Sequence, residues 1–572
     1  MPSIKSIPGS SLDRRTVLRR AAAIATLSAA RLFPAWAQPV SAGIPAPKPA
    51  LDGTDIRLRI AHLMMTIDGK RRHAIGLNGT VPGPLIRLKQ GSSVRLHVTN
   101  DLDVDSSIHW HGLLVPAQYD GVPGVSFPGI PPRSTFTYEF PLIQAGTYWY
   151  HSHSGLQEQM GHYGPLVIDP EETDPIPFDR EHVVLFSDYS PLHPHQIFTK
   201  LKQQPGYFNH HKQTLAGLLA GRDQAAPERF SWGGMRMDPT DISDVTGTTY
   251  TYLVNGHGPA DNWTGLFRPG ERVRLRLINA SAMTIFNLRI PGLAMTVVQA
   301  DGANVRPVTV DELQITVAET FDVIVSPAED RAYTIVAEAV DRSGMARATL
   351  APRGNMVAPV PPLRPRPIAT MKDMGMDAME HAAMGHGAMS MRDPAVAPQV
   401  RLGPGVQTIS PMPVDRTGEP GQGLEDAGHQ VLVYRDLVAL DRNPDVRSPE
   451  RSMEIHLTGN MERYMWAFDG VKFSALTHPI PFRKDERVRV TLVNDTMMAH
   501  PIHLHGHFFE LVTGHADHSP RKHTVNVPPG GKVTFDVTTD ALGDWAFHCH
   551  MLYHMHAGMM QVVTVRPSDD GA

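Results

Sequence analysis

The chain of 572 residues contains a single cysteine, Cys549. A structural disulfide needs two cysteines, so this thiol is either an inert buried group or the ligand of a metal. Charged residues make up only 19% of the chain, and the formal net charge is −5. This balance argues against nucleic acid as the main partner, because phosphate binding requires clustered cations.

Long hydrophobic runs are also missing, so we expect no membrane span. The stretch from Ala21 to Ala30 is shorter than the ~20 residues that a spanning helix needs. It follows Asp13–Arg19, which resembles a twin-arginine export motif, and it precedes a small-x-small cleavage site at Ala35–Ala37. We interpret residues 1–37 as an export signal and expect a periplasmic protein.

Glycine and proline are abundant, with 48 and 50 residues. They favour many short strands joined by turns over long helices. Three segments share an alternation of period 2 that ends in asparagine, which is typical of a half-buried strand; they are Ser93–Asn100, Arg272–Asn279 and Arg487–Asn494. This repeat predicts an all-β chain of three Greek-key barrel or sandwich domains.

The repeats and the composition between them set the expected domain limits. We predict β-domains at 51–172, 178–350 and 425–572 after the signal at 1–37. Residues 351–424 are dense in proline, glycine and methionine and show no strand periodicity, so we expect a linker or mobile loop there.

The 30 histidines are the most informative feature of the composition. His109 and His111 follow the asparagine of the first repeat at the same spacing at which His503 and His505 follow that of the third. The middle copy has apolar residues, Leu288 and Ile290, at these two positions. We therefore expect the middle domain to keep the strand and to hold no metal through these positions.

A second motif aligns between the same two copies, because His151-Ser-His153 overlays His548-Cys-His550. Side chains on a strand alternate, so a His-x-His pair puts both imidazoles on one face. Two neutral imidazoles placed in this way can reach one copper or two adjacent coppers. The first and third copies each supply two such pairs, and only the third supplies a thiolate.

Cys549 has the neighbours that a blue copper site needs. His500 and His554 offer imidazoles, and Met559 offers a weak axial thioether. On the strand His548–His550 the cysteine points opposite to both neighbours, so it can hold one copper while they hold others. The peptide between them would then give electrons a short covalent route.

At these residues the chain resembles a known family, the three-domain multicopper oxidases, through the motifs HWHG, HSH, HPIHLHG and HCHMLYHMHAGM. The resemblance implies cupredoxin-like domains and about four copper ions, one of type 1, one of type 2 and two of type 3. The ligands carried over are His500, Cys549, His554 and Met559 for type 1, His109 and His503 for type 2, and His111, His151, His153, His505, His548 and His550 for the type 3 pair. Asp120, in YDGVPG, is similar to the family's acidic residue that helps deliver protons to reduced oxygen; the alternative is a plain turn residue before glycine.

Within this family, the export motif, the segment WGGMRMDPTDISDVTG (232–247) and the methionine-rich linker resemble the periplasmic copper-resistance protein A branch. Two positions depart from the pattern. His523 stands where many laccases carry an acidic residue, and His556 stands where members of the branch commonly have glutamate. These departures concern the proton chemistry around the site rather than copper ligation.

The methionine-rich part of the linker is a candidate auxiliary site for Cu(I). Thioethers are soft ligands that prefer Cu(I), and a mobile chain can gather several of them around one ion. The candidates are Met371, Met374, Met376, Met379, Met384, Met389 and Met391. The alternative is a flexible linker of biased composition.

We expect an oxidase that takes single electrons at the type 1 site, through Cys549, His500 and His554, and reduces O2 to water at the other three coppers. Its expected donors are Cu(I) and, less selectively, phenols, with a role in copper resistance. Alternatives are a periplasmic copper store with little oxidase activity and a general laccase acting mainly on phenols. A copper nitrite reductase is disfavoured, because that family lacks the paired type 3 ligands.

Overall fold

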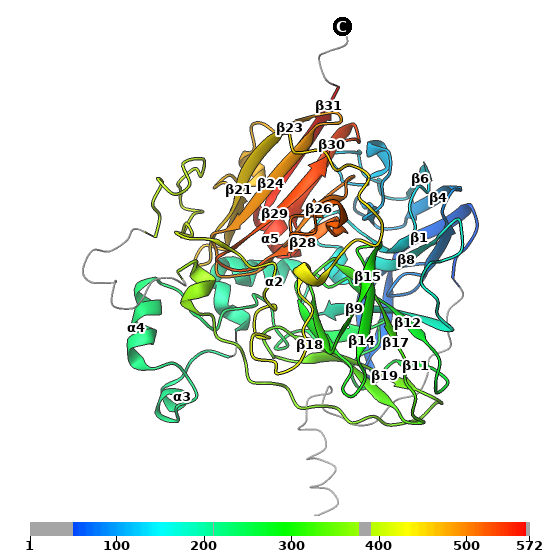
Figure 1. The fold of residues 1–572 in the computed structure, drawn as a ribbon, viewed down its shortest axis with the longest axis horizontal. Coiled ribbons are helices and arrows are strands. Elements are labelled where there is room, and N and C mark those ends of the chain that lie inside the picture. Colours follow the sequence, from blue (N-terminus) through cyan, green and yellow to red (C-terminus); the bar gives the residue numbers. More distant parts are fainter. Residues whose placement is uncertain (1–49, 210, 377–390, 568–572) are drawn as a thin grey trace, which may run out of the picture.

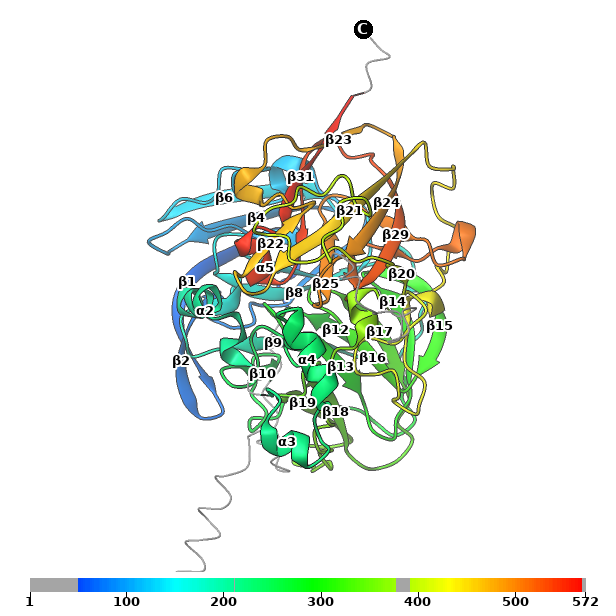
Figure 2. The same cartoon turned by 90° about the vertical axis from the view of Figure 1, so that its left-hand side faces the viewer.

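The structure is a computed structural model that describes residues 50–209, 211–376 and 391–567. The export signal expected at 1–37 and three of the linker methionines, Met379, Met384 and Met389, lie outside the described residues. The described chain forms three pairs of β-sheets. In Figures 1 and 2 the N-terminal pair (blue to cyan), the middle pair (green) and the C-terminal pair (orange to red) pack side by side.

The N-terminal unit has two four-stranded sheets. In spatial order the first is β2 (Lys70–Leu77), β1 (Asp55–Ile67), β4 (Ser93–Asn100) and β6 (Ser134–Pro141), and the second is β3 (Ile86–Lys89), β8 (Tyr163–Asp169), β7 (Gly146–His151) and β5 (His109–His111). Its core is the cluster of buried side chains between them, which includes Ile60, Leu96 and Trp110.

The middle unit has a six-stranded and a five-stranded sheet. In spatial order the first sheet is β10 (Thr251–Val254), β9 (Arg180–Tyr189), β12 (Val273–Asn279), β17 (Thr320–Val325), β14 (Met295–Ala300) and β15 (Ala303–Val310). The second sheet is β11 (Thr264–Leu266), β19 (Met345–Ala351), β18 (Tyr333–Ala339), β13 (Phe286–Arg289) and β16 (Glu312–Ile315). Leu288 and Ile290, which replace the paired histidines, are buried in its apolar core.

The C-terminal unit repeats this arrangement. In spatial order its first sheet is β22 (Met465–Phe468), β21 (Arg451–Asn460), β24 (Arg487–Asn494), β29 (Gly531–Thr538), β26 (Phe509–Leu511) and β27 (Arg521–Lys522), and the short strand β20 (Val414–Asp415) also pairs with β29. Its second sheet is β23 (Ile480–Arg483), β31 (Met560–Arg566), β30 (Gly543–Cys549), β25 (His500–Leu504) and β28 (Thr524–Val527). One apolar core runs through the middle and C-terminal units.

The three strands recognised as a sequence repeat occupy equivalent places. Each of β4, β12 and β24 is parallel to one neighbour and antiparallel to the other. The all-β prediction is confirmed. The domain limits stay a prediction; the strand β20 falls within the stretch expected to be a linker.

Within the described residues the helices are few and short: α2 (Pro194–Gln203), α3 (Leu215–Leu219), α4 (Ala226–Gly234) and α5 (Leu552–Ala557), together with several single 3₁₀ turns. Figure 1 shows α3 and α4 at the periphery, whereas α5 lies among the C-terminal strands. In the part of the chain that the structure describes, no helix is both long and apolar enough to cross a membrane.

Candidate metal centres

The asparagine that ends each repeated strand shapes the loop that leads to the histidines. The side chain of Asn100 accepts from the amide two residues ahead at 3.0 Å and donates to the carbonyl four residues ahead at 2.9 Å. Asn494 makes the same two bonds at 2.9 and 2.7 Å. Both side chains are fully buried. The repeated residue therefore builds a repeated turn ahead of β5 and β25.

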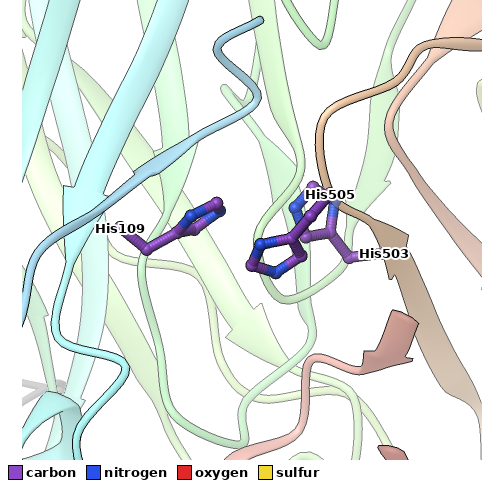
Figure 3. A group of neighbouring side chains, drawn as sticks. All are labelled: His109, His503 and His505. Carbon is purple, nitrogen blue, oxygen red and sulfur yellow. The ribbon is translucent and has the colours of Figure 1, made fainter. Parts of the chain in front are cut away.

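These strands bring the histidine pairs together where the N-terminal and C-terminal units meet. His109 on β5 lies opposite His151 on β7, and His503 on β25 lies opposite His548 on β30. Figure 3 shows the ring of His109 reaching from one unit towards those of His503 and His505 in the other. The rings of His109 and His505 stack with their centroids 3.9 Å apart.

The paired histidines fall into groups whose ligand atoms lie within 4.8 Å of one another. Two of these groups divide the six residues expected for the type 3 pair into trios: His111, His151 and His550, and His153, His505 and His548. A third group joins the two residues expected for type 2, His109 and His503, with His505. The structure therefore brings together all eight residues that the repeats predicted.

The chemistry of these groups fits metal ions. His109 Nδ1 donates to the carbonyl of Asp120 at 2.7 Å, and His503 Nδ1 donates to the carbonyl of His523 at 2.7 Å. A carbonyl only accepts, so the proton of each ring is on Nδ1 and the lone pair is on Nε2. Both Nε2 atoms are buried and have no hydrogen-bond partner. Buried lone pairs without a donor are what a bound cation would satisfy.

Electrostatics keeps the rings in the neutral form that binds metals. Burial and the neighbouring imidazoles lower the pKa well below its ordinary value at His111, His151, His153, His503, His505 and His550. Burial also lowers the pKa of His548, to about 4. At neutral pH these imidazoles are uncharged and can each offer a lone pair.

Asp120 lies against the histidine groups and is fully buried. Its carboxylate is 3.0 Å from Nδ1 of His505 and 3.4 Å from Nδ1 of His109. Ser126 donates to the same carboxylate at 3.4 Å. Asp120 thus lies in the turn before Gly121 with its carboxylate behind two imidazoles of the histidine groups.

Glu158 is a second carboxylate at this site, and sequence analysis missed it. Its Oε2 atom is 2.6 Å from Nδ1 of His151, and both side chains are buried. Burial raises its pKa well above the ordinary value. The available signal was its place in QEQM, five residues after the HSH motif.

The two departures from the family pattern occupy different environments. His523 is buried, and its ligand atom lies within 4.8 Å of those of His111 and His503. Burial lowers the pKa of His523 to about 4. His556 is exposed, and its ring packs edge-on against Phe198 at 4.8 Å between centroids. Only His523 adjoins the histidine groups.

Cys549 lies in a separate group with His500 and His554, and all three are fully buried. The sulfur is 3.6 Å from Nδ1 of His500 and 3.8 Å from Nδ1 of His554. Burial raises the pKa of the Cys549 thiol, so a metal would have to displace its proton. Met559 is fully buried, and its carbonyl accepts from the amide of Cys549 at 3.1 Å.

The outer nitrogens of these two imidazoles are also anchored. Nε2 of His500 is 2.8 Å from the hydroxyl of Thr496, and Nε2 of His554 is 2.7 Å from the carboxylate of Asp244. Both Nδ1 atoms are thereby directed towards Cys549. Asp244 was not singled out from the sequence; it lies in the segment 232–247, which served only as a branch marker.

Strand alternation at β30 separates the two kinds of site. Cys549 joins the group with His500 and His554, whereas its neighbours His548 and His550 each join one of the two trios. One tripeptide therefore contacts three groups of potential ligands.

Four of the seven candidate Cu(I) methionines lie within the described residues, and they pack into one methionine-rich cluster. Met374 and Met376 are buried, and Met371 and Met391 are partly buried around them. The other members are Ala369, Trp232, Met235, Met237, Met461 and Met497. This part of the linker is thus packed against the body of the protein, and the cluster includes methionines from three further segments.

Comparison with known proteins agrees with this site. Three models of the multicopper oxidase family match residues 59–173, 232–355 and 447–569. A copper resistance protein A homolog of Pseudomonas syringae pv. tomato is 48% identical, with 97% of this chain and 99% of that protein covered. Copper resistance protein A of Escherichia coli is 47% identical, with coverage of 90% and 93%. The laccase of Botrytis aclada superposes with a TM-score of 0.62 at 22% identity, covering 90% of this chain and 88% of that one.

The chain belongs to the multicopper oxidase family, whose members are copper-dependent oxidoreductases. This membership favours an oxidase over the copper store considered from the sequence. Copper is accordingly the cofactor of this family, and the buried histidine and cysteine groups are consistent with it.

Proposed function

We propose that this oxidase takes single electrons from Cu(I), and less selectively from phenols, and reduces O2 to water as part of copper resistance in the periplasm. The observation that carries the proposal is the tripeptide His548–His550, which connects the cysteine group to both histidine trios. The two relatives named for copper resistance, and the twin-arginine-like motif within 1–37, support the physiological setting.

We assign the ligands from these groups and from the resemblance to the family, which adds Met559. Type 1 copper would be held by His500, Cys549, His554 and Met559, type 2 copper by His109 and His503, and the type 3 pair by His111, His151, His153, His505, His548 and His550. When bound, copper supplies one-electron transfer at the first site and the reduction of O2 at the other three ions. The protein orients the imidazoles through their outer nitrogens and excludes water by burial.

Asp120 is proposed to hold protons for oxygen reduction. Its carboxylate lies within hydrogen-bonding distance of Nδ1 of His505, inside the buried histidine site. A proton held at Oδ2 would be available at the place where reduced oxygen needs it.

Two observations favour Cu(I) over phenols as the main donor. His500 and His554 are fully buried and their outer nitrogens are already bonded, so neither offers an open edge to an organic donor. The methionine-rich cluster instead gathers soft thioethers, and its member Met497 is three residues from His500. A soft cluster at this place raises the local concentration of Cu(I) and does nothing comparable for phenols.

The test replaces Met371, Met376 and Met391 together by leucine, which keeps similar volume and removes the thioethers. We expect kcat/KM for Cu(I) to fall at least about tenfold, while kcat/KM for a phenolic donor changes little. Met295→Leu is the matched control, because Met295 is fully buried in the middle core. Equal proportional changes for the two donors would remove the case for Cu(I), and absence of O2 consumption with either donor would refute the oxidase.

A further inference from the structure

The type 1 histidines differ in what holds their outer nitrogens. Nε2 of His554 faces a carboxylate oxygen of Asp244 at 2.7 Å, whereas Nε2 of His500 faces the neutral hydroxyl of Thr496 at 2.8 Å. The side chains of Asp244 and His554 are 2% and 0% exposed. Asp244 is 310 residues away from His554 in the chain and precedes β10 of the middle unit. The unit without paired histidines thus contributes a charge to the copper site.

The same carboxylate oxygen has a second partner. The hydroxyl of Tyr464 donates to Oδ2 of Asp244 at 2.7 Å, and Tyr464 is fully buried. A donated hydrogen bond withdraws charge from the oxygen that also faces His554.

We infer that Asp244 is a positioning residue that sets the reduction potential of the type 1 copper through His554, and that Tyr464 moderates its effect. The inference rests on the proposed ligand role of His554. The carboxylate fixes the ring with its proton on Nε2 and its lone pair on Nδ1, which lies 3.8 Å from the sulfur of Cys549. Its negative charge, in a buried site of low dielectric, favours the more positive oxidised metal over the reduced one.

Opposite signs are therefore expected for two substitutions. Asp244→Asn removes the charge and should raise the potential. Tyr464→Phe removes the competing donor, leaves more charge directed at His554 and should lower the potential by a smaller amount. In the double variant the tyrosine substitution should have no further effect, because the carboxylate through which it acts is gone.

The experiment is a redox titration of the blue absorption band in the copper-loaded full-length protein. For Asp244→Asn we expect the equilibrium to shift towards the reduced form at least about tenfold, which is about 59 mV for a one-electron couple. Thr496→Val is the matched control, because it removes a neutral partner from the other histidine, and its shift should be clearly smaller.

An unchanged potential in Asp244→Asn would overturn the inference, as would shifts of the same sign in Asp244→Asn and Tyr464→Phe. Tyr464→Phe removes one hydroxyl and keeps the ring, so its sign decides the question even where Asp244→Asn binds too little copper to titrate. A wild-type protein without a blue band would instead refute the proposed type 1 ligands, so the two failures are distinguishable.

Discussion

The sharpest stability prediction concerns Lys522, a fully buried lysine between the middle and C-terminal units. Its Nζ atom lies 3.0 Å from Asp301 and 3.1 Å from Glu319, both fully or almost fully buried. Asp301 also accepts from the backbone amides of His523 and Thr524, at 3.3 and 3.1 Å. The ion pair therefore secures the segment between β27 and β28, where the carbonyl of His523 orients His503.

Lys522→Met removes the charge and keeps most of the side-chain volume. The ammonium group lies 5.1 Å from the ring centroid of Phe321 and 5.5 Å from that of Tyr434, so the apolar surroundings suit methionine. What remains is two buried carboxylates without their cation. Removing one partner of a buried ion pair costs about 3–5 kcal/mol, and we expect the free energy of unfolding to fall by that amount.

The measurement is urea unfolding of the full-length protein, wild type against variant. Lys484→Met is the matched control, because Lys484 is exposed and 3.8 Å from Asp485, and its loss should stay below about 1 kcal/mol. Adding Asp301→Asn and Glu319→Gln to Lys522→Met should restore part of the loss, because the buried charges are then gone. A loss no greater than that of Lys484→Met would refute the reasoning.

Three further predictions concern the metal sites. Cys549→Ser should abolish the blue charge-transfer band and oxidase turnover together while far-UV circular dichroism stays unchanged, and an active variant would contradict the type 1 assignment. His111→Ala or His153→Ala should keep the blue band. In stopped-flow measurements a donor should bleach this band, and O2 should no longer restore it; retained turnover would show that the ligands are divided wrongly. Burial lowers the pKa of His523 from 6.5 to about 4, so the unfolded chain binds the extra proton and acidification destabilises the fold. His523→Asn should therefore reduce the stability lost by the copper-free protein between pH 7 and pH 5 by about 2 kcal/mol, and an unchanged loss would contradict this pKa.

The repeats and motifs could be recognised in the sequence because each of them involves only residues that are close together in the chain. Alternation of period 2 ending in asparagine predicts β4, β12 and β24, and a His-x-His pair on a strand necessarily puts both rings on one face. The same alternation separates Cys549 from His548 and His550. Ligand types and their spacing within each copy thus followed from a few neighbouring residues, and so did the all-β class and the likeness to multicopper oxidases.

The partners of those ligands depend on tertiary structure. Asp244 reaches His554 and Lys522 reaches Asp301 across the contact between units, and no periodicity in one segment encodes which carboxylate will meet which ring. The cluster that joins Met374 to Met235 and Met497 likewise combines distant segments. Sequence alone predicted which side chains could bind copper. Packing of the three units decided which charges and hydrogen bonds surround them, because those contacts exist only after distant strands have been brought together.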